Sequence, residues 1–196
     1  MPRLAAELER AYVAAATHQD FTLDPFVETE LADADSDLRG MLAAAAIGAV
    51  ASRYLAVGTP RSIGLVGDAA ACAASLAAHR AWFAPVDVRW VAPAGVSREA
   101  HGGGDFGSDR PRLVSLGEAL AADIVCVHAK TTLSAQHVRR GTHVNALAPV
   151  DIDPTLAAVV VDELAPIAAG LVDGRTLDEI TVYTALDLAI GLAVFA

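Results

Sequence analysis

Lys130 is the first residue whose chemistry draws attention, because it is the only lysine among the 14 basic residues of the chain. It follows an uninterrupted apolar run, residues 123–129, of the kind found in strands buried on both faces, and His128 belongs to that run. In open parallel sheets, ligands bind at the edge formed by the carboxyl ends of the strands. A lysine there either pairs with a carboxylate or phosphate or is simply solvated. Lys130 is therefore a candidate catalytic residue.

Six histidines and two cysteines give no pattern typical of a metal site. The histidines occur without an HxxxH pair and without cysteine or carboxylate partners at metal-ligand spacing, so we expect no metal. Cys72 and Cys126 both lie in apolar runs, which is typical of buried thiols in a reducing compartment.

The elements that must position these residues alternate between strand and helix. Helices are predicted over 3–17, 38–56 and 68–82, the second capped by Ser36 or Asp37, with short ones near 118–121 and in 134–141. Strands are predicted over 62–67, 86–92, 112–117, 123–129, 143–148 and 157–163, and residues 180–196 are predicted to end the chain as strand plus helix. This alternation predicts an open, mostly parallel sheet with helices on both faces.

Composition excludes several classes of protein. The formal net charge of −10 argues against nucleic acid as a partner, because phosphate backbones would repel the chain. Apolar stretches are too short or too interrupted by charge to span a bilayer, and the first 20 residues carry acids that a signal peptide lacks. These features predict a cytoplasmic protein without a membrane partner.

Several segments, taken in order, resemble the ornithine cyclodeaminase/mu-crystallin family, whose members use NAD(P)H in amino-acid and cyclic-imine chemistry. The segments are LRGMLAAAAIGAVASRYLA (38–56), RSIGLVGDAAACAASLAAHRAW (61–82), ADIVCVHA (122–129), GTHVNALAP (141–149), VVVDE (159–163) and GRTLDEITVY (174–183). The resemblance covers roughly residues 36–196 and implies a Rossmann-like α/β domain there. Residues 1–35 are then a helical arm and an acidic linker. Most of the family's N-terminal half has no counterpart, so the chain resembles a truncated, divergent member.

The resemblance also implies roles for individual residues. Arg39 would bind a substrate carboxylate, or is a solvated residue of the first helical turn. His143 would contact substrate, or is a histidine hydrogen-bonded inside the protein. Asp151, one residue past the position of the family's catalytic aspartate, would handle protons, or is a loop acid. The implied cofactor-binding residues are Gly64, Gly67, Asp68, Ala69, Thr142 and Asn145.

Three positions depart from the family's cofactor pattern. Ala69 replaces the second glycine of the dinucleotide turn, and Asp68 places a negative charge where the helix N-terminus would receive phosphate. Asp68 is better explained as an N-cap. Val91-Ala92-Pro93 offers no ribose-binding acid, and Ala185-Leu186-Asp187 replaces the family's Ser-x-Gly. The sequence therefore makes NAD(H) or NADP(H) a doubtful cofactor.

Three functions remain open from the sequence. The chain could act on or bind an amino or imino acid as a divergent enzyme. It could be a non-catalytic scaffold, as a homo-oligomer or as the partner of a full-length relative. It could also be a cofactor-independent enzyme with a repurposed pocket.

Overall fold

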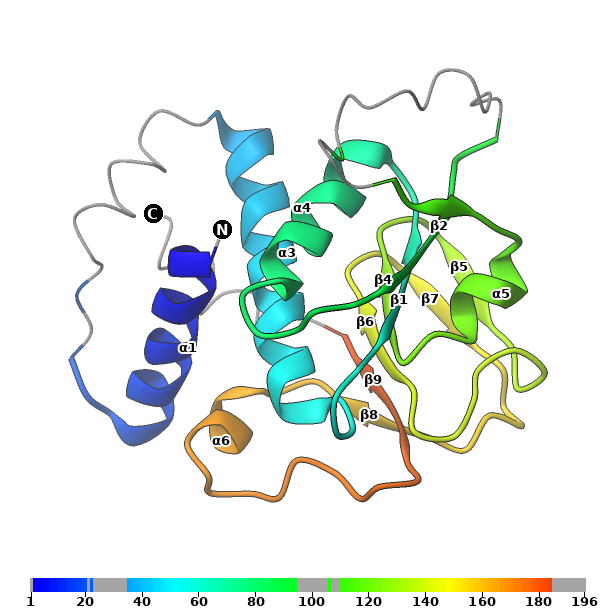
Figure 1. Cartoon of the computed structure of the whole chain (residues 1–196). Helices are drawn as coiled ribbons and strands as arrows, with labels where there is room; N and C mark the ends of the chain where they lie inside the picture. The colour runs from blue at the N-terminus through cyan, green and yellow to red at the C-terminus, as the bar shows by residue number, and fades with distance from the viewer. Residues whose placement is uncertain (1, 21, 23–34, 95–105, 107–109, 185–196) are drawn as a thin grey trace.

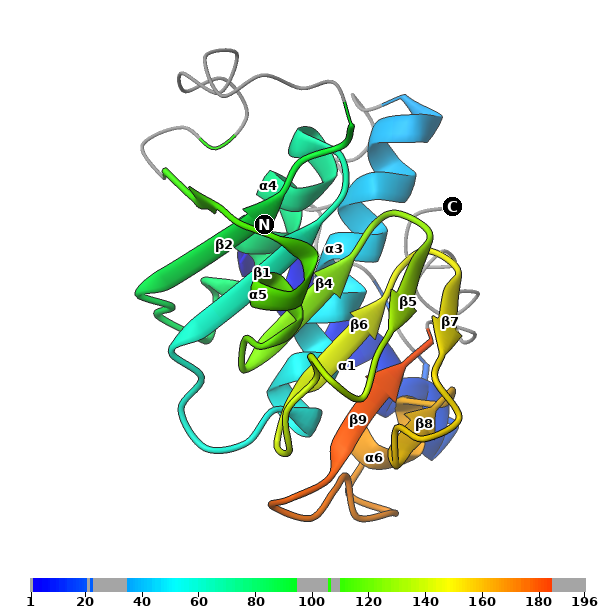
Figure 2. The same ribbon diagram turned by 90° about the vertical axis from the view of Figure 1, so that its right-hand side faces the viewer.

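Seven parallel strands form the central sheet of the protein, in the order β3-β2-β1-β4-β6-β9-β8 (Figures 1 and 2). A computed structural model describes residues 2–20, 22, 35–94, 106 and 110–184. In chain order the elements are α1 (Pro2–Thr17), α3 (Ser36–Leu55), β1 (Ser62–Val66), α4 (Ala69–His79), β2 (Asp87–Val91), β3 (Arg112–Leu113), α5 (Leu116–Leu120), β4 (Ile124–Val127), β5 (Thr131–Leu133), β6 (His143–Ala146), β7 (Val150–Ile152), β8 (Ala158–Val161), α6 (Ala165–Ala168) and β9 (Ile180–Tyr183).

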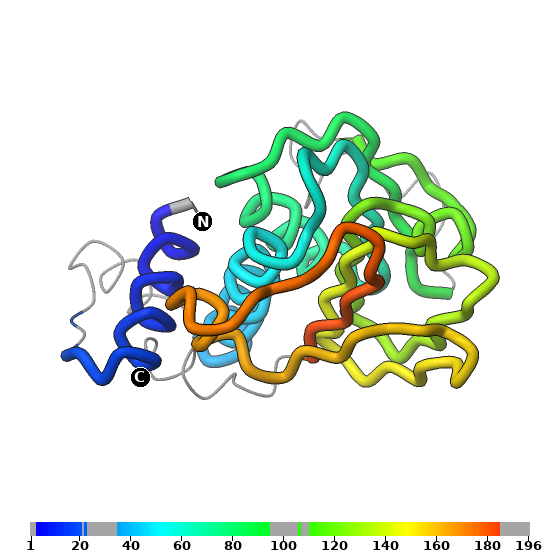
Figure 3. Tube along the Cα trace, turned by 90° about the horizontal axis from the view of Figure 1, so that it is seen from below, coloured from blue at the N-terminus to red at the C-terminus, as the bar shows by residue number. Residues whose placement is uncertain are grey.

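Helices cover the two faces of the sheet unequally. Figure 1 shows α3 and α4 side by side on one face, with α1 outside α3. Of the described residues, those on the other face form the short helix α5 and a two-stranded parallel sheet, β5-β7 (Figure 2). Seen from below, α6 lies beside α1 (Figure 3). The predicted open parallel sheet with helices on both faces is confirmed.

Alanine residues form the contact between α3 and α4. Ala45 and Ala49 of α3 pack against Ala74 and Ala78 of α4, and all four are buried. Larger side chains build the rest of the core, around Leu8, Tyr12 and Ile47 on the α1 side and around Val125, Leu133 and Val144 under β5-β7. The small contact residues let α3 and α4 lie close together as one layer.

Some predicted elements are wrong in detail. Residues 134–141 form turns and no helix, while the short elements β5, β7 and α6 were not predicted. The N-cap of α3 is Asp35, whose Oδ1 accepts a hydrogen bond from Leu38 N at 2.8 Å, in place of Ser36 or Asp37. The acidic linker over residues 23–34 and the predicted C-terminal helix after Thr184 lie outside the described residues.

Gly64 fixes the distance between α5 and the sheet. A Cβ atom on Gly64 would lie 2.2 Å from the carbonyl oxygen of Ala119, so only glycine permits this approach. Gly40, in the first half of α3, has nothing within 4 Å of such a Cβ.

These two glycines predict opposite effects of alanine. Gly64→Ala should lower the free energy of unfolding by at least about 2 kcal/mol, because the backbone of α5 must move. Gly40→Ala should raise it by about 0.5–1 kcal/mol, through helix propensity alone. Urea unfolding of both variants checks this, and equal values for the two would contradict the packing assigned to Gly64.

Candidate functional site

The ligand-binding edge of the sheet is identified by its topology. Strand order reverses between β1 and β4, since β2 and β3 extend one side of the sheet and β6, β9 and β8 the other. In such sheets the crevice lies at the carboxyl ends of the two strands that flank the reversal. Gly67 and Asp68 follow β1 there, and His128 and Lys130 follow β4.

Gly67 makes the turn from β1 into α4. Its φ is +129°, and a Cβ atom would lie 3.0 Å from the Cβ of His128. Its N–H donates to Val91 O at 3.2 Å, and its carbonyl accepts from Trp90 Nε1 at 2.9 Å. A glycine is required here for both backbone conformation and space.

Asp68 closes the N-terminus of α4. Its Oδ1 accepts hydrogen bonds from Ala70 N at 2.9 Å and Ala71 N at 3.4 Å, which confirms the predicted N-cap. These N–H groups belong to the set that faces phosphate when a helix N-terminus binds an anion. The protein's own carboxylate therefore takes up that binding capacity.

His128 lies beside this turn, half-buried at the end of β4. Its N–H donates to Val66 O at 2.8 Å, which extends the β1-β4 pairing up to the crevice. Its Nε2 lies 2.8 Å from Ser75 Oγ of α4. Burial lowers the pKa of His128 to about 4, against the opposing effect of the Asp68 carboxylate. The imidazole is consequently neutral at pH 7.

Lys130 and Asp151 both belong to the region of the small sheet. Thr131 pairs with Val150 and Thr132 with Asp151, so Lys130 directly precedes the strand that pairs with the one carrying Asp151. Both side chains are exposed, whereas the flanking Val150 and Ile152 pack toward the core. Asp151 therefore lies in a strand, on the outer face of β5-β7.

A chain of hydrogen bonds crosses the core from β9 to α4, through residues that are fully buried. His79 Nδ1 must donate to the Ser75 carbonyl, at 2.7 Å, so its Nε2 accepts from Ser52 Oγ at 2.8 Å. Ser52 Oγ in turn accepts from Asn145 Nδ2 at 2.9 Å.

The same chain continues toward β9. Asn145 Oδ1 accepts from His143 Nε2 at 3.0 Å, so His143 Nδ1 accepts from Thr181 Oγ1 at 2.8 Å. Burial lowers the pKa of His79 to about 4 and that of His143 to about 3. Both imidazoles are therefore held neutral in a single, fully directed network.

Three residues expected at the site are located elsewhere. His143 and Asn145 belong to the interior, with no exposed surface for a substrate or cofactor. Thr142 lies at the amino end of β6, where its Oγ1 donates to Ala122 O at 3.0 Å, on the edge opposite Gly67. The GTH segment resembles a ligand-binding motif in sequence, but here its polar groups bind the protein itself.

Arg39 and Gly64, two further residues expected at the site, lie in α3 and β1. Arg39 is half-buried in the first two turns of α3, which begins at the same end of the molecule as α4 (Figure 1). Gly64 lies in the middle of β1 under α5, so packing explains it. Ala69 is the first residue of α4 and places a methyl group beside the crevice turn. The structure thus brings Gly67, Asp68, Ala69 and Lys130 to one edge.

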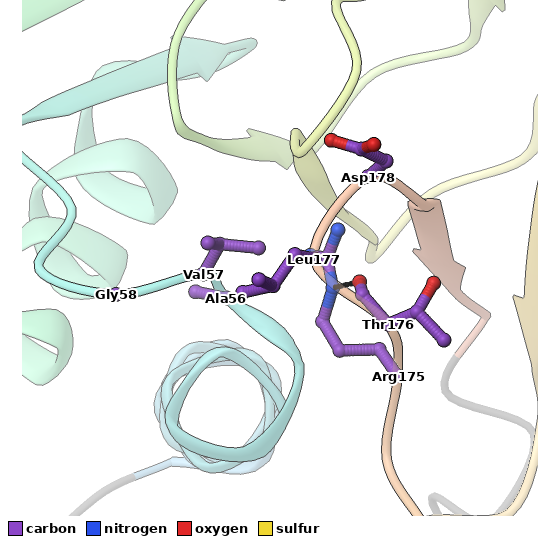
Figure 4. A pocket seen from close by; sticks show the side chains of 7 residues that line it. All are labelled: Ala56, Val57, Gly58, Arg175, Thr176, Leu177 and Asp178. Atoms are coloured by element: carbon purple, nitrogen blue, oxygen red, sulfur yellow. Dashed lines mark hydrogen bonds between the residues drawn. The ribbon is translucent and has the colours of Figure 1, made fainter.

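An open pocket of about 520 Å³ lies near the opposite, amino edge, where Leu177 faces Ala56 and Val57 (Figure 4). Arg175 lines it, and no sequence pattern pointed to this residue. Its guanidinium donates to the carbonyl groups of Leu55, Thr176 and Glu179. Arg175 thereby joins the end of α3 to the loop before β9. The pocket is therefore the space between these two segments, and its arginine is used to hold them together.

The described part of the chain has neither a metal-binding cluster nor a membrane-spanning helix. It holds no group of three or more histidine, cysteine, aspartate or glutamate side chains placed to bind a metal ion. No helix within it is both long and apolar enough to cross a membrane.

Comparison with known proteins identifies the fold. No protein-family model and no curated protein sequence matches the chain. It is similar to an archaeal NAD-bound alanine dehydrogenase dimer (22% identity, 82% of this chain and 64% of that one, TM-score 0.64). An NAD⁺ complex of Paracoccus denitrificans iminosuccinate reductase gives 23% identity over 80% and 62% of the two chains, with a TM-score of 0.66.

A third solved structure is a lysine cyclodeaminase that recognises L-lysine, L-ornithine and L-2,4-diaminobutyric acid (20% identity, 82% of this chain and 59% of that one, TM-score 0.63). The chain spans about three fifths of the length of these structures. At such identities the likeness concerns the fold, which is the Rossmann-like fold of the cyclodeaminase and dehydrogenase enzymes to which the sequence motifs pointed.

The buried histidines predict loss of stability in mild acid. A free histidine has a pKa of about 6.5, so below this pH the unfolded chain binds protons that folded His79 and His143 do not. Their stabilising contribution is complete above pH 6.5 and falls by up to about 1.4 kcal/mol per histidine and pH unit as the pH drops toward 4.

Urea unfolding between pH 7.5 and 5 measures this slope above the range where most carboxyl groups titrate. His79→Gln should reduce the slope, because one buried histidine that the unfolded chain protonates is then missing. A free energy of unfolding that stays constant over this range would contradict the neutral network.

Proposed function

We propose that the chain is a divergent member of the ornithine cyclodeaminase/mu-crystallin family whose crevice binds a small amino or imino acid. The observation that carries this proposal is the fold shared with a dehydrogenase, a reductase and a cyclodeaminase of such compounds, reached independently by the order of the sequence motifs. The buried free thiols Cys72 and Cys126 support a reducing compartment, the cytoplasm.

Lys130 is the proposed contact for the ligand carboxylate. Its exposed ammonium group lies three residues after the end of the crevice strand β4, and a positive charge there attracts a carboxylate. Asp151, on the neighbouring strand of β5-β7, is the proposed acceptor for the ligand's ammonium or iminium group and for a proton. Arg39, at the start of α3, is a second proposed carboxylate contact at this end of the molecule.

The residues at the crevice do not fit the nicotinamide dinucleotides that such enzymes use. Ala70 N and Ala71 N donate to the Asp68 carboxylate, which would also repel a pyrophosphate. The Ala69 methyl group stands where a close backbone approach is needed. β2 ends at Val91 and is followed by Ala92, so no carboxylate is there to bind a ribose. The proposed activity therefore includes no hydride transfer.

This misfit predicts weak cofactor binding that a double substitution improves. Titration with NADH or NADPH, followed by calorimetry, should give no saturation below about 1 mM for the unmodified protein. The variant Asp68→Ser, Ala69→Gly keeps a capping hydroxyl, removes the charge and frees the turn, and should bind NADH at least tenfold more tightly. Asp173→Ser, which removes an exposed acid elsewhere, is the matched control. Micromolar binding by the unmodified protein would overturn this part of the proposal.

Amino-acid binding predicts a thermal shift that depends on Lys130. A panel of L-alanine, L-proline, L-ornithine and pyrroline-2-carboxylate should contain a compound that raises the Tm, because a ligand that binds only the folded state stabilises it. Lys130→Gln should weaken that compound at least fivefold, whereas Lys130→Arg should largely keep it. Arg61→Gln removes a charge at the opposite edge and should have no effect. A shift equally large in Lys130→Gln would exclude the assigned site.

A second candidate function is that of a binding subunit. Val159 and Val160 on the edge strand β8 are 41% and 51% exposed, and Leu171, Val172 and Leu177 are also exposed. Such a surface suits a homo-oligomer or a related partner subunit. A binding subunit should respond neither to the nicotinamide cofactors nor to the amino-acid panel. A cofactor-independent enzyme, the third possibility, should bind a compound of the panel and convert it without any nicotinamide.

A further inference from the structure

A pocket of about 350 Å³ lies on the α5 side of the sheet and has no part in the proposed function. Its lining residues are Arg89 of β2, Arg112 of β3, Glu118 of α5, Ala121 directly after α5, and Arg139 from the segment before β6. Three guanidinium groups and one carboxylate thus face one space, in a chain whose formal net charge is −10.

Arg89 forms the fixed wall of this pocket. Its side chain is only 16% exposed, with Nη2 2.6 Å from Asp87 Oδ2. Its Nε donates to the same oxygen at 2.8 Å, and its Nη1 donates to Glu118 O at 2.8 Å. Held from two sides, this guanidinium keeps its position whether or not a ligand is present.

Arg112 is held more loosely. Its guanidinium nitrogens lie 3.6 Å from Asp87 Oδ1 and 3.5 Å from Glu118 Oε1, and its side chain is 56% exposed. The other oxygen of Glu118 accepts from Ser115 N and Ser115 Oγ, as part of the cap of α5. These long, exposed ion pairs are weak, so a more highly charged anion can compete for Arg112.

Arg139 supplies the third guanidinium, from an exposed position. Among the contacts of the described residues, it has no hydrogen bond from its side chain and no ion pair within 4 Å. It acts electrostatically on Asp123, but Asp123 Oδ2 already accepts from Arg61 N, Ser62 N and Ser62 Oγ. The donors of Arg139 are therefore available to the pocket that it lines.

We propose that this pocket binds the phosphoryl group of a small molecule. Guanidinium groups on different elements can each donate to a different oxygen of a tetrahedral phosphate, whereas a carboxylate offers only two oxygens in one plane. Phosphate carries up to two charges near neutral pH, so it competes better than the single charges of Asp87 and Glu118 for Arg112. The site lies apart from the crevice and works independently of it.

Calorimetric titration at constant ionic strength tests the site, with inorganic phosphate, pyrophosphate and glycerol 3-phosphate as probes. At least one probe should bind with a Kd below about 1 mM. Arg112→Gln and Arg139→Gln should each weaken that binding at least fivefold. Arg140→Gln removes the same charge from the adjacent exposed residue and should leave the Kd unchanged, as should Lys130→Gln at the crevice.

The possible outcomes distinguish binding in this pocket from nonspecific attraction of anions to exposed arginines. Equal binding of all three probes identifies the free anion as the ligand, and preference for glycerol 3-phosphate identifies a phosphate monoester. Absence of binding by every probe overturns the proposal, and so does an equal loss in Arg140→Gln and Arg139→Gln. Because Lys130 lies outside this pocket, failure here leaves the amino-acid proposal intact.

Discussion

The directed hydrogen-bond chain through the core is the interaction on which the rest of the structure depends. It joins Thr181 and His143 of the sheet, through Asn145, to Ser52 of α3 and His79 of α4. Each hydrogen bond in this network has one donor–acceptor direction that lets all the others form. The helices and strands that carry these side chains must therefore keep their positions relative to one another. A buried polar group without its partner costs more than the bond contributes, which makes this network a constraint on the fold more than a source of stability. Gly48 completes the arrangement, because its missing side chain lets α3 approach to contact Asn145, with only 3.3 Å left for a Cβ.

The crevice is a consequence of this constraint. His79 links α4 to Asn145 of β6 through Ser52 of α3, and Ser75, one turn earlier on α4, holds His128 at the end of β4. The N-terminus of α4 is therefore set at the carboxyl edge, where Gly67 contacts His128. The ligand-binding edge and the buried network thus share the same helix, and a displacement of α4 would disturb both.

The sequence predicted those parts of the fold that local patterns determine. Strands β1 and β4 are continuous apolar runs, and Asp68 before an alanine-rich segment is a helix start with a local cause. The three- and four-residue elements β5, β7 and α6 carry too little periodicity to be recognised. His143 and Asn145 were expected to contact ligands because the resemblance of the segment GTHVNALAP (141–149) to the family implied it. Asn145 instead donates to Ser52, 93 residues away in the chain, and His143 accepts from Thr181, 38 residues away, so only the fold brings these partners together. The arginine pocket is likewise assembled from four separate segments.

The Asp68 carboxylate occupies the place at the N-terminus of α4 where a bound anion would otherwise lie. A helix N-terminus carries partial positive charge and unsatisfied N–H groups, and an anion placed there is stabilising. In this chain the anion is covalently part of the protein, and such an N-cap contributes about 1 kcal/mol to stability. A phosphate ligand at the same place would have to displace a carboxylate that is always present at high local concentration and whose loss also destabilises α4. Helix α4 is therefore complete without a ligand. The proposed selectivity for small carboxylate-bearing compounds over dinucleotides rests on two charges at the crevice, the Asp68 carboxylate on one side and the exposed Lys130 ammonium group on the other.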